Sequence, residues 1–304
     1  MKIIENYLKE ENYFGLLVYG PSIDEIIEIY NNTILVPLKS LYHNHYIDYI
    51  KDFFETFKYK YVVSNIETFD KDYSDNIPVC YILYKSNESQ SNILNFEKEC
   101  SVHLEKAKLF LSLISGQSPV EFFKVVKMNE KIMYKTELVQ YNRLHRLWIS
   151  LEEKLSFINN AEKIIDNQNF SLSLFHDANK ETNHIYKCAR YFMVLESITE
   201  SNHESRKHVK SFFAKNNYSP TLNHNNSVRN YNLSNIDAVE IAGIMRAKLF
   251  HGATLKYDYF KRIISVQDYN YLISNPEELS KHMRDLCETA FYLKNNQNNE
   301  NASR

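Results

Sequence analysis

Residues 235–252, NIDAVEIAGIMRAKLFHG, constrain the fold more than any other stretch of the chain. From residue 241 onward this stretch is apolar or small except at three positions, Arg246, Lys248 and His251. A helix that is apolar nearly all the way round is normally buried against several neighbouring helices. The stretch therefore predicts the central helix of a helical bundle.

Both ends of this helix carry recognisable signals. Ser234 or Asn235 can cap the N-terminus, because either side chain can accept a hydrogen bond from an unpaired N–H group of the first turn. Asp237 and Glu240 suit the positive end of the helix dipole. Gly252 is expected to end the helix in the left-handed conformation, which places His251 on the last turn.

Arg246 and His251 admit two interpretations. In the first, Arg246 pairs with a buried carboxylate and His251 only caps the helix, where the dipole favours a protonated imidazole. In the second, both side chains handle a phosphate group. Five residues of helix place the two side chains about 140° apart. Neighbouring helices or a second subunit would therefore have to complete any pocket around them.

Glu196 lies in a second predicted helix, residues 184–199, among apolar neighbours. A carboxylate in such surroundings is costly unless it is paired. Either Glu196 is exposed on the reverse face of an ordinary amphipathic helix, or it holds Arg246 in place. The second interpretation explains both unusual charges at once.

Two short segments resemble a known family. RAKLFHG, residues 246–252, resembles the Arg-x4-6-His motif of HEPN domains, and CARYFMVLESITES, residues 188–201, is similar to the "LE" helix of their ApeA-like branch. The resemblance covers residues 171–293. Two positions depart from the family pattern. Ala247 stands where a polar residue usually follows the Arg, and Ala253 stands where some toxin branches carry Tyr.

The resemblance implies an antiparallel bundle of four or five helices that pairs as a homodimer and cleaves RNA without a metal or other cofactor. It places the protein in host defence, as an antiphage or toxin-like endoribonuclease. The residues implied to be catalytic are Arg246, His251 and Glu196. The basic residues expected to bind substrate are Lys248, Arg190, Arg206 and Arg229.

The implied roles agree with the chemistry of the side chains. An imidazole can take and return a proton near neutral pH, so His251 would act as general base or acid at the ribose 2′-OH. A guanidinium presents a fixed fork to phosphate oxygens and keeps its charge, so Arg246 would stabilise the phosphorane. Attack by the 2′-OH confines the reaction to RNA.

The composition of the whole chain limits which partners and which kinds of site are expected. The 304-residue chain has a net charge of −2, with 19 Lys and Arg against 24 Asp and Glu in residues 1–170 and 17 against 14 afterwards. The excess of positive charge thus lies in the half that carries the motif, a mild indication of an anionic partner. The four cysteines are scattered, so neither a zinc site nor a disulfide framework is expected. We expect no membrane span and a cytoplasmic location.

The chain in order predicts an α+β protein. Residues 1–140 are expected to form a mixed α/β domain that senses a trigger ligand or protein, and residues 141–170 a helical connector. Residues 171–294 are expected to form the all-α bundle, and residues 295–304 a disordered tail. Strands are predicted at residues 13–19, 59–63, 79–84, 122–126 and 132–139, and helices at residues 41–57, 102–114, 141–165, 184–199, 205–215 and 276–293.

Residues 216–232, NNYSPTLNHNNSVRNYN, are predicted to be a long loop from which His224 and Arg229 could reach a substrate. Two further functions stay open beside the ribonuclease. One is a non-catalytic HEPN module that binds RNA or a nucleotide, which Ala247 favours. The other is a helical scaffold in which Arg246, Glu196 and His251 form only a structural network.

Overall fold

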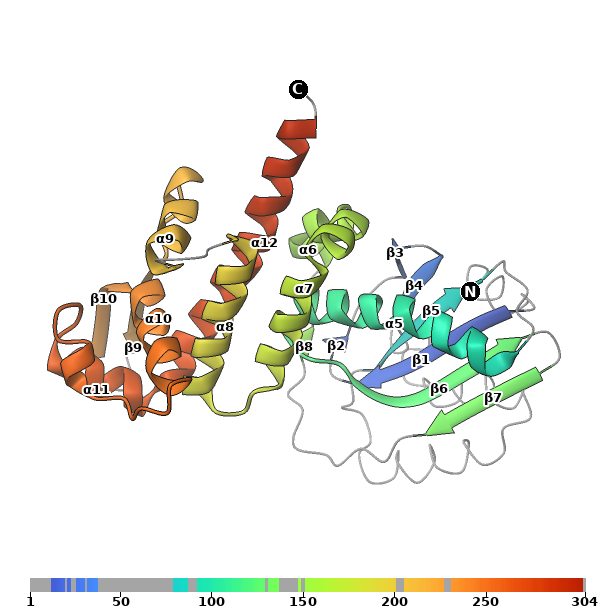
Figure 1. Ribbon diagram of the computed structural model, residues 1–304, viewed down its shortest axis with the longest axis horizontal. Coiled ribbons are helices and arrows are strands. Elements are labelled where there is room, and N and C mark those ends of the chain that lie inside the picture. The colour runs from blue at the N-terminus through green and yellow to red at the C-terminus, as the bar shows by residue number, and fades with distance from the viewer. Residues whose placement is uncertain are drawn as a thin grey trace. The chain divides into compact units, whose positions relative to one another are not determined.

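The computed structural model divides into two compact units, residues 1–162 and residues 163–304, and each is described by itself (Figure 1). The residues that the structure describes are 12–19, 21–22, 26–30, 32–37, 79–86, 92–128, 131–136, 147–148, 151–200, 205–226 and 231–302. The α+β class predicted from the sequence is confirmed: the first unit contains a sheet and the second is largely helical.

The first unit is built on a six-stranded sheet whose neighbouring strands are all antiparallel. Its strands, in the order β3-β4-β5-β1-β6-β7, are β3 Ile27–Tyr30, β4 Thr33–Pro37, β5 Val79–Lys85, β1 Asn12–Tyr19, β6 Val120–Met128 and β7 Lys131–Thr136. Two-residue strands β2 Pro21–Ser22 and β8 Leu147–Trp148 pair separately in parallel. Helix α6, Leu151–Ile158, follows β8 in this unit.

Helix α5, Ile93–Ser115, contacts five strands of this sheet (Figure 1). Six of its buried side chains recur at spacings of three and four residues, as expected for one face of a helix: Phe96, Cys100, Leu104, Ala107, Leu111 and Ile114. Asn92 caps its N-terminus through a hydrogen bond from the Leu94 N–H, and Gly116 ends it with φ +65°. The core of this unit therefore lies between α5 and the sheet.

Most predictions for this unit agree with the structure where it describes them. The strands predicted at residues 13–19, 79–84, 122–126 and 132–139 correspond to β1, β5, β6 and β7, and the helix predicted at residues 102–114 is part of α5. The helix at residues 41–57 and the strand at residues 59–63 lie outside the described residues. The prediction of a single connector helix at residues 141–165 is wrong, because its described part contains β8, α6, a turn at residues 159–160 and the start of a second helix at Ala161.

The second unit contains six α-helices and one hairpin among its described residues. The elements are α7 Ala161–Lys180, α8 His184–Ile198, α9 Ser205–Lys215, β9 Thr221–Asn226, β10 Tyr231–Asp237, α10 Ala238–Leu249, the 3-10 turn η1 Tyr257–Tyr259, α11 Val266–Ser274 and α12 Pro276–Ala302. Helix α8 contacts α9, α10 and α12, so it lies at the centre of the unit's packing.

The helices predicted at residues 184–199 and 205–215 are confirmed as α8 and α9, and that at residues 276–293 is part of α12. Three expectations are wrong. The loop at residues 216–232 contains β9 and the start of β10, so the region is not all-α. Helix α11 was not predicted. Helix α12 continues to Ala302, so most of the tail expected to be disordered is helical.

The predicted start of the central helix, α10, is also wrong. Ser234 and Asn235 lie in β10, and Asp237 caps the helix instead, because its Oδ1 accepts a hydrogen bond of 2.9 Å from the Glu240 N–H. Asn235 adopts φ +57° at a bulge between Leu233 and Ile236, a conformation that Asn tolerates better than most residues. The polypeptide therefore enters α10 directly from a strand.

Candidate functional site

Glu196 and Arg246 form an ion pair between α8 and α10. The Arg246 Nε lies 3.4 Å from the Glu196 Oε2, and the exposed fractions of the two side chains are 39% and 16%. Neighbouring residues on α8, Leu195 and Ile198, are buried in the contact with the rest of the unit. The two helices thus hold a largely buried carboxylate against a half-exposed guanidinium, in the arrangement that the sequence suggested.

The ion pair uses only part of the hydrogen-bonding capacity of Arg246. A guanidinium has five N–H donors, and the contact with Glu196 is made through Nε. In the part of the chain that the structure describes, no other carboxylate pairs with Arg246. The Arg246 side chain is 39% exposed, so an anion can reach the guanidinium while the carboxylate holds it in place.

His251 lies two residues after Leu249, the last residue of α10, in a Schellman turn. The Ala253 N–H donates to the Lys248 carbonyl at 2.9 Å, the Gly252 N–H donates to the Leu249 carbonyl at 3.0 Å, and Gly252 has φ +73°. The prediction that Gly252 ends the helix is confirmed. His251 is exposed, and within the described residues its ring makes no hydrogen bond or ion pair. An exposed imidazole thus stands just beyond the helix end that carries Arg246.

Lys248 lies between these two residues in sequence and contacts an aromatic ring. Its Nζ is 4.2 Å from the ring centroid of Tyr259, in η1. A cation over the face of an aromatic ring is attracted by the ring quadrupole. Lys248, predicted to bind substrate, is therefore held at the C-terminal end of α10 together with Arg246 and His251.

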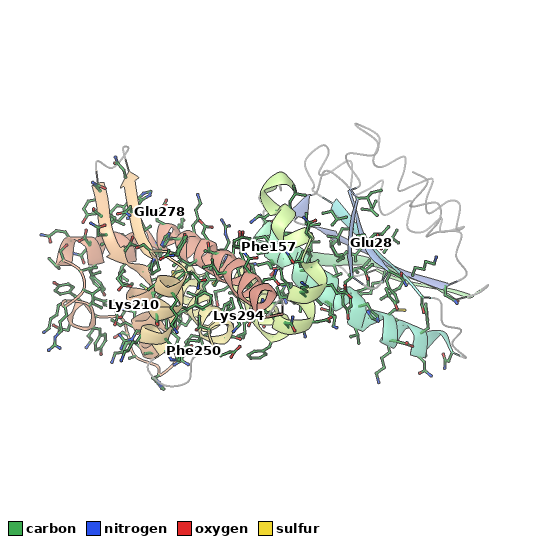
Figure 2. The ribbon with its side chains drawn as sticks, turned by 90° about the horizontal axis from the view of Figure 1, so that it is seen from above. Glu28, Phe157, Lys210, Phe250, Glu278 and Lys294 are labelled. Atoms are coloured by element: carbon green, nitrogen blue, oxygen red, sulfur yellow. The ribbon has the colours of Figure 1, made fainter. Side chains whose placement is uncertain are left out.

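Arg206 is placed differently from the sequence interpretation. It forms an ion pair with Glu240, and its side chain crosses α10 where Gly243 leaves room, since a Cβ on Gly243 would lie 2.5 Å from the Arg206 Cγ. Lys210, labelled in Figure 2, also donates to Glu240 at 2.9 Å, which raises the pKa of Lys210. Arg206 thus joins α9 to α10, and the structure gives it this structural role in the described residues.

Arg190, also expected to bind substrate, is not brought to this end of α10. Arg190 donates from Nε to Glu181 at 3.2 Å, and it precedes Glu196 by six residues, about 9 Å along α8. Arg229 lies outside the described residues. His224, expected on a mobile loop, is in β9 and pairs with Glu278 of α12 (Figure 2) at 3.3 Å.

Two aromatic residues near the motif were not singled out from the sequence. Phe250 is 48% exposed although it lies between Lys248 and His251, and Tyr259, the ring beneath Lys248, is 36% exposed. The alternation of aromatic and basic residues from residue 246 to residue 262 is a sequence signal that could have drawn attention to them. The exposure of the two rings, however, cannot be read from the sequence.

Neither a metal centre nor a membrane span is found where the structure describes the chain. No three His, Cys, Asp or Glu side chains among the described residues are grouped so that they could hold a metal ion. None of the described helices combines the length and the apolar character that crossing a bilayer requires.

No family model matches the sequence, and no curated protein or solved structure is detectably similar to the chain. The residues at the end of α10 therefore have to be interpreted from their own chemistry.

Proposed function

We propose that the second unit is a metal-independent endoribonuclease of the HEPN type that acts in host defence, in the cytoplasm where its RNA substrate is found. The observation that carries this proposal is the Glu196–Arg246 ion pair, which fixes a half-exposed guanidinium at the end of α10 that leads to the exposed His251. Cleavage by a ribose 2′-OH needs proton transfer and stabilisation of the phosphorane, for which an imidazole and a guanidinium are suited.

In the proposed reaction, neutral His251 accepts the proton of the 2′-OH while the 2′-oxygen attacks the adjacent phosphorus. Arg246 stabilises the extra negative charge of the phosphorane through its fork of N–H donors. The bond to the 5′-oxygen then breaks, and a protonated imidazole supplies the proton that this oxygen takes up. The products are a 2′,3′-cyclic phosphate and a 5′-OH.

Glu196 is a positioning residue in this mechanism, since it contacts Arg246 and is not assigned to the reacting atoms. Its carboxylate keeps the guanidinium in one orientation, which lowers the cost of ordering it when a phosphate binds. A second copy of the chain would supply the second imidazole and the opposite wall of the site. That arrangement would also complete the pocket that Arg246 and His251 of one chain leave open.

The test is cleavage of total RNA by the full-length protein in EDTA. Replacing His251 or Arg246 by Ala should each lower the cleavage rate by about two orders of magnitude or more, the usual contribution of a general acid–base group or an oxyanion donor. His208→Ala is the matched control, because His208 is an exposed histidine on α9. Cleavage that EDTA abolishes, or that survives His251→Ala, contradicts the proposal.

A second function is favoured by Ala247, which stands where the HEPN motif usually carries a polar residue. In that case the same end of α10 binds RNA or a nucleotide without cleaving it. Binding that is lost in Arg246→Ala, with no turnover in any variant, identifies this function. Unchanged activity with a lowered melting temperature in both variants identifies a structural network instead.

We further propose that the first unit senses a trigger or restrains the nuclease, since its described residues carry no catalytic constellation. Deleting residues 1–140 should then change the rate or the target of cleavage. Identical cleavage by the shortened and the full-length proteins contradicts this division of roles.

A further inference from the structure

Residues 246–262, RAKLFHGATLKYDYFKR, are unusually basic for a protein with a net charge of −2. They contain five Lys and Arg and one acidic residue, Asp258. The segment runs from the end of α10 through the Schellman turn and η1. We call it the basic aromatic segment. Positive charge collected in this way favours an anionic ligand.

The charges of this segment are accessible. Lys256, Lys261 and Arg262 are exposed. Lys261 pairs with Asp258 at 3.3 Å, and both side chains are more than half exposed, so that ion pair is weak. Within the described residues no carboxylate pairs with Lys256 or Arg262. These two cations are therefore not neutralised by the fold around them.

Two exposed aromatic rings lie among these charges. Phe250 and Tyr259 are 48% and 36% exposed, whereas Phe260, the neighbour of Tyr259, is fully buried. Phe260 anchors the segment to the core, so the exposure of the other two rings does not come from a loosely packed turn. Figure 2 labels Phe250 in the C-terminal unit. The ring directly precedes His251 in the chain.

Aromatic rings interleaved with unpaired cations suit a single-stranded nucleic acid. Successive unpaired bases stack on such rings, and the cations track the phosphates between them. A duplex buries its base faces in its own stack and cannot use the rings in this way. An acidic peptide could satisfy the cations but has no planar bases for the rings.

We propose that the basic aromatic segment binds single-stranded RNA, with one base stacked on Phe250, a second base displacing the Lys248 ammonium from the ring of Tyr259, and phosphates held by Lys256 and Arg262. This inference rests on the proposed ribonuclease for the choice of RNA over DNA, and it extends that function by assigning the residues outside the Arg246–His251 motif that hold the strand. Because Phe250 adjoins His251, the base stacked on Phe250 flanks the phosphate that is cleaved.

The experiment measures fluorescence anisotropy of a labelled 12-nucleotide RNA, single-stranded or in a duplex, in EDTA. The full-length protein carries His251→Ala so that the probe is not cut. Phe250→Leu and Tyr259→Leu remove a ring and keep an apolar side chain. Each should weaken single-strand binding about tenfold, in the range measured for one stacked base. Phe170→Leu is the matched control, because Phe170 is a 70% exposed ring on α7.

A second measurement separates the cations from the rings. The double variant Lys256→Gln with Arg262→Gln should reduce the slope of log affinity against log salt concentration by about 1.4, two phosphate contacts on a single strand. The ring variants should leave that slope unchanged. Melting curves of all variants check that the fold is retained.

Three results overturn the inference: unchanged single-strand affinity in both ring variants, tighter binding of the duplex, or binding of phosphatidylserine vesicles that needs Phe250 while RNA is not bound. The outcomes for the two proposals are distinguishable. Ring-dependent RNA binding without cleavage by the unmutated protein supports the binding site and contradicts the ribonuclease. Cleavage that needs His251 but not the rings supports the ribonuclease and contradicts the binding site.

Discussion

Glu196 exposes 16% of its side chain, and at that degree of burial a carboxylate needs a charged partner. Its partner Arg246 is more exposed, so the free-energy cost of losing the ion pair differs between the two residues. Removing the guanidinium leaves a poorly solvated carboxylate, whereas removing the carboxylate leaves an arginine that can turn to solvent. The pair therefore orients Arg246 more than it stabilises the unit.

Glu196→Gln is expected to lower RNA cleavage about tenfold while shifting the melting temperature by only a few degrees, since a partly exposed ion pair contributes about 1 kcal/mol. The rate constant should fall more than the RNA affinity, because the charge of Arg246 remains but its orientation is lost. Single-turnover cleavage assays separate the two quantities. Glu196→Asp should restore part of the rate, and equal rates for the Gln variant and the parent would show that the carboxylate does not position Arg246.

A second buried charge lies in the first unit. Lys108 is almost fully buried, and its Nζ lies 2.5 Å from the Glu121 Oε1 and 2.7 Å from the Glu105 Oε1. Lys124 reaches the other oxygen of Glu121 at 2.8 Å. Burial would raise the pKa of Glu121, but the hydrogen bonds from Lys108 and Lys124 outweigh it and lower the pKa to about 2.

Because the folded-state pKa lies below the usual value of 4.5, the ionised carboxylate stabilises the unit above pH 4.5. This contribution, on the order of 3 kcal/mol, is lost as the pH falls from about 4.5 to about 2. Glu121→Gln should therefore destabilise the protein by that order at pH 7 and by much less near pH 2, as measured by urea denaturation. Glu105→Gln, which removes a 54% exposed carboxylate from the same lysine, should change stability by less than about 1 kcal/mol.

At the scale of elements, α8, α9 and most of α10 could be predicted because apolar side chains recur along them at helical spacing. The hairpin could not. In β9 and β10 the fully buried residues are Leu222, Leu233 and Ile236, and most of the other side chains are Asn, Ser or Thr. Their strand conformation comes from the pairing of the two strands and from packing of β9 against α10 and α12, which a pattern of single residues does not record.

The candidate site was partly predictable for the same reason. A Glu and an Arg in otherwise apolar helices indicated a pair, and the ion pair is present. The exposure of Phe250 and Tyr259 could not be foreseen, because a helix end surrounded by apolar residues suggests burial for every ring. Exposure depends on where the chain turns after Gly252, and that is a property of the fold.

That turn has a testable energetic role. Gly252 adopts φ +73° with no atom near the position of a Cβ, so the cost of Gly252→Ala is conformational and not steric. We expect a loss of about 1 kcal/mol in the free energy of unfolding. Gly252→Asn should lose less, since Asn tolerates the left-handed region. Both values come from denaturant unfolding, and equal stabilities for Gly, Asn and Ala would show that the Schellman turn does not hold in solution.

At the scale of the whole molecule, the proposed reaction uses two imidazoles, and the turn after α10 of one chain supplies one. His251 must accept a proton from the 2′-OH while a second group protonates the 5′-oxygen. The described residues place no second histidine beside His251 by any hydrogen bond or ring contact. A homodimer in which two copies of α10 face one RNA strand would meet this requirement with a single sequence.

Such a dimer is tested by purifying, through two different tags, a heterodimer in which one protomer carries His251→Ala. If both histidines serve one cleft, the heterodimer should retain less than about one tenth of the parent activity. If each protomer cleaves RNA alone, it should retain about one half. The control heterodimer carries His208→Ala on one protomer and should be fully active. The oligomeric state is measured first by sedimentation velocity, which should show a species of about twice the 36.1 kDa protomer mass. A protein that cleaves RNA as a monomer would contradict the shared cleft.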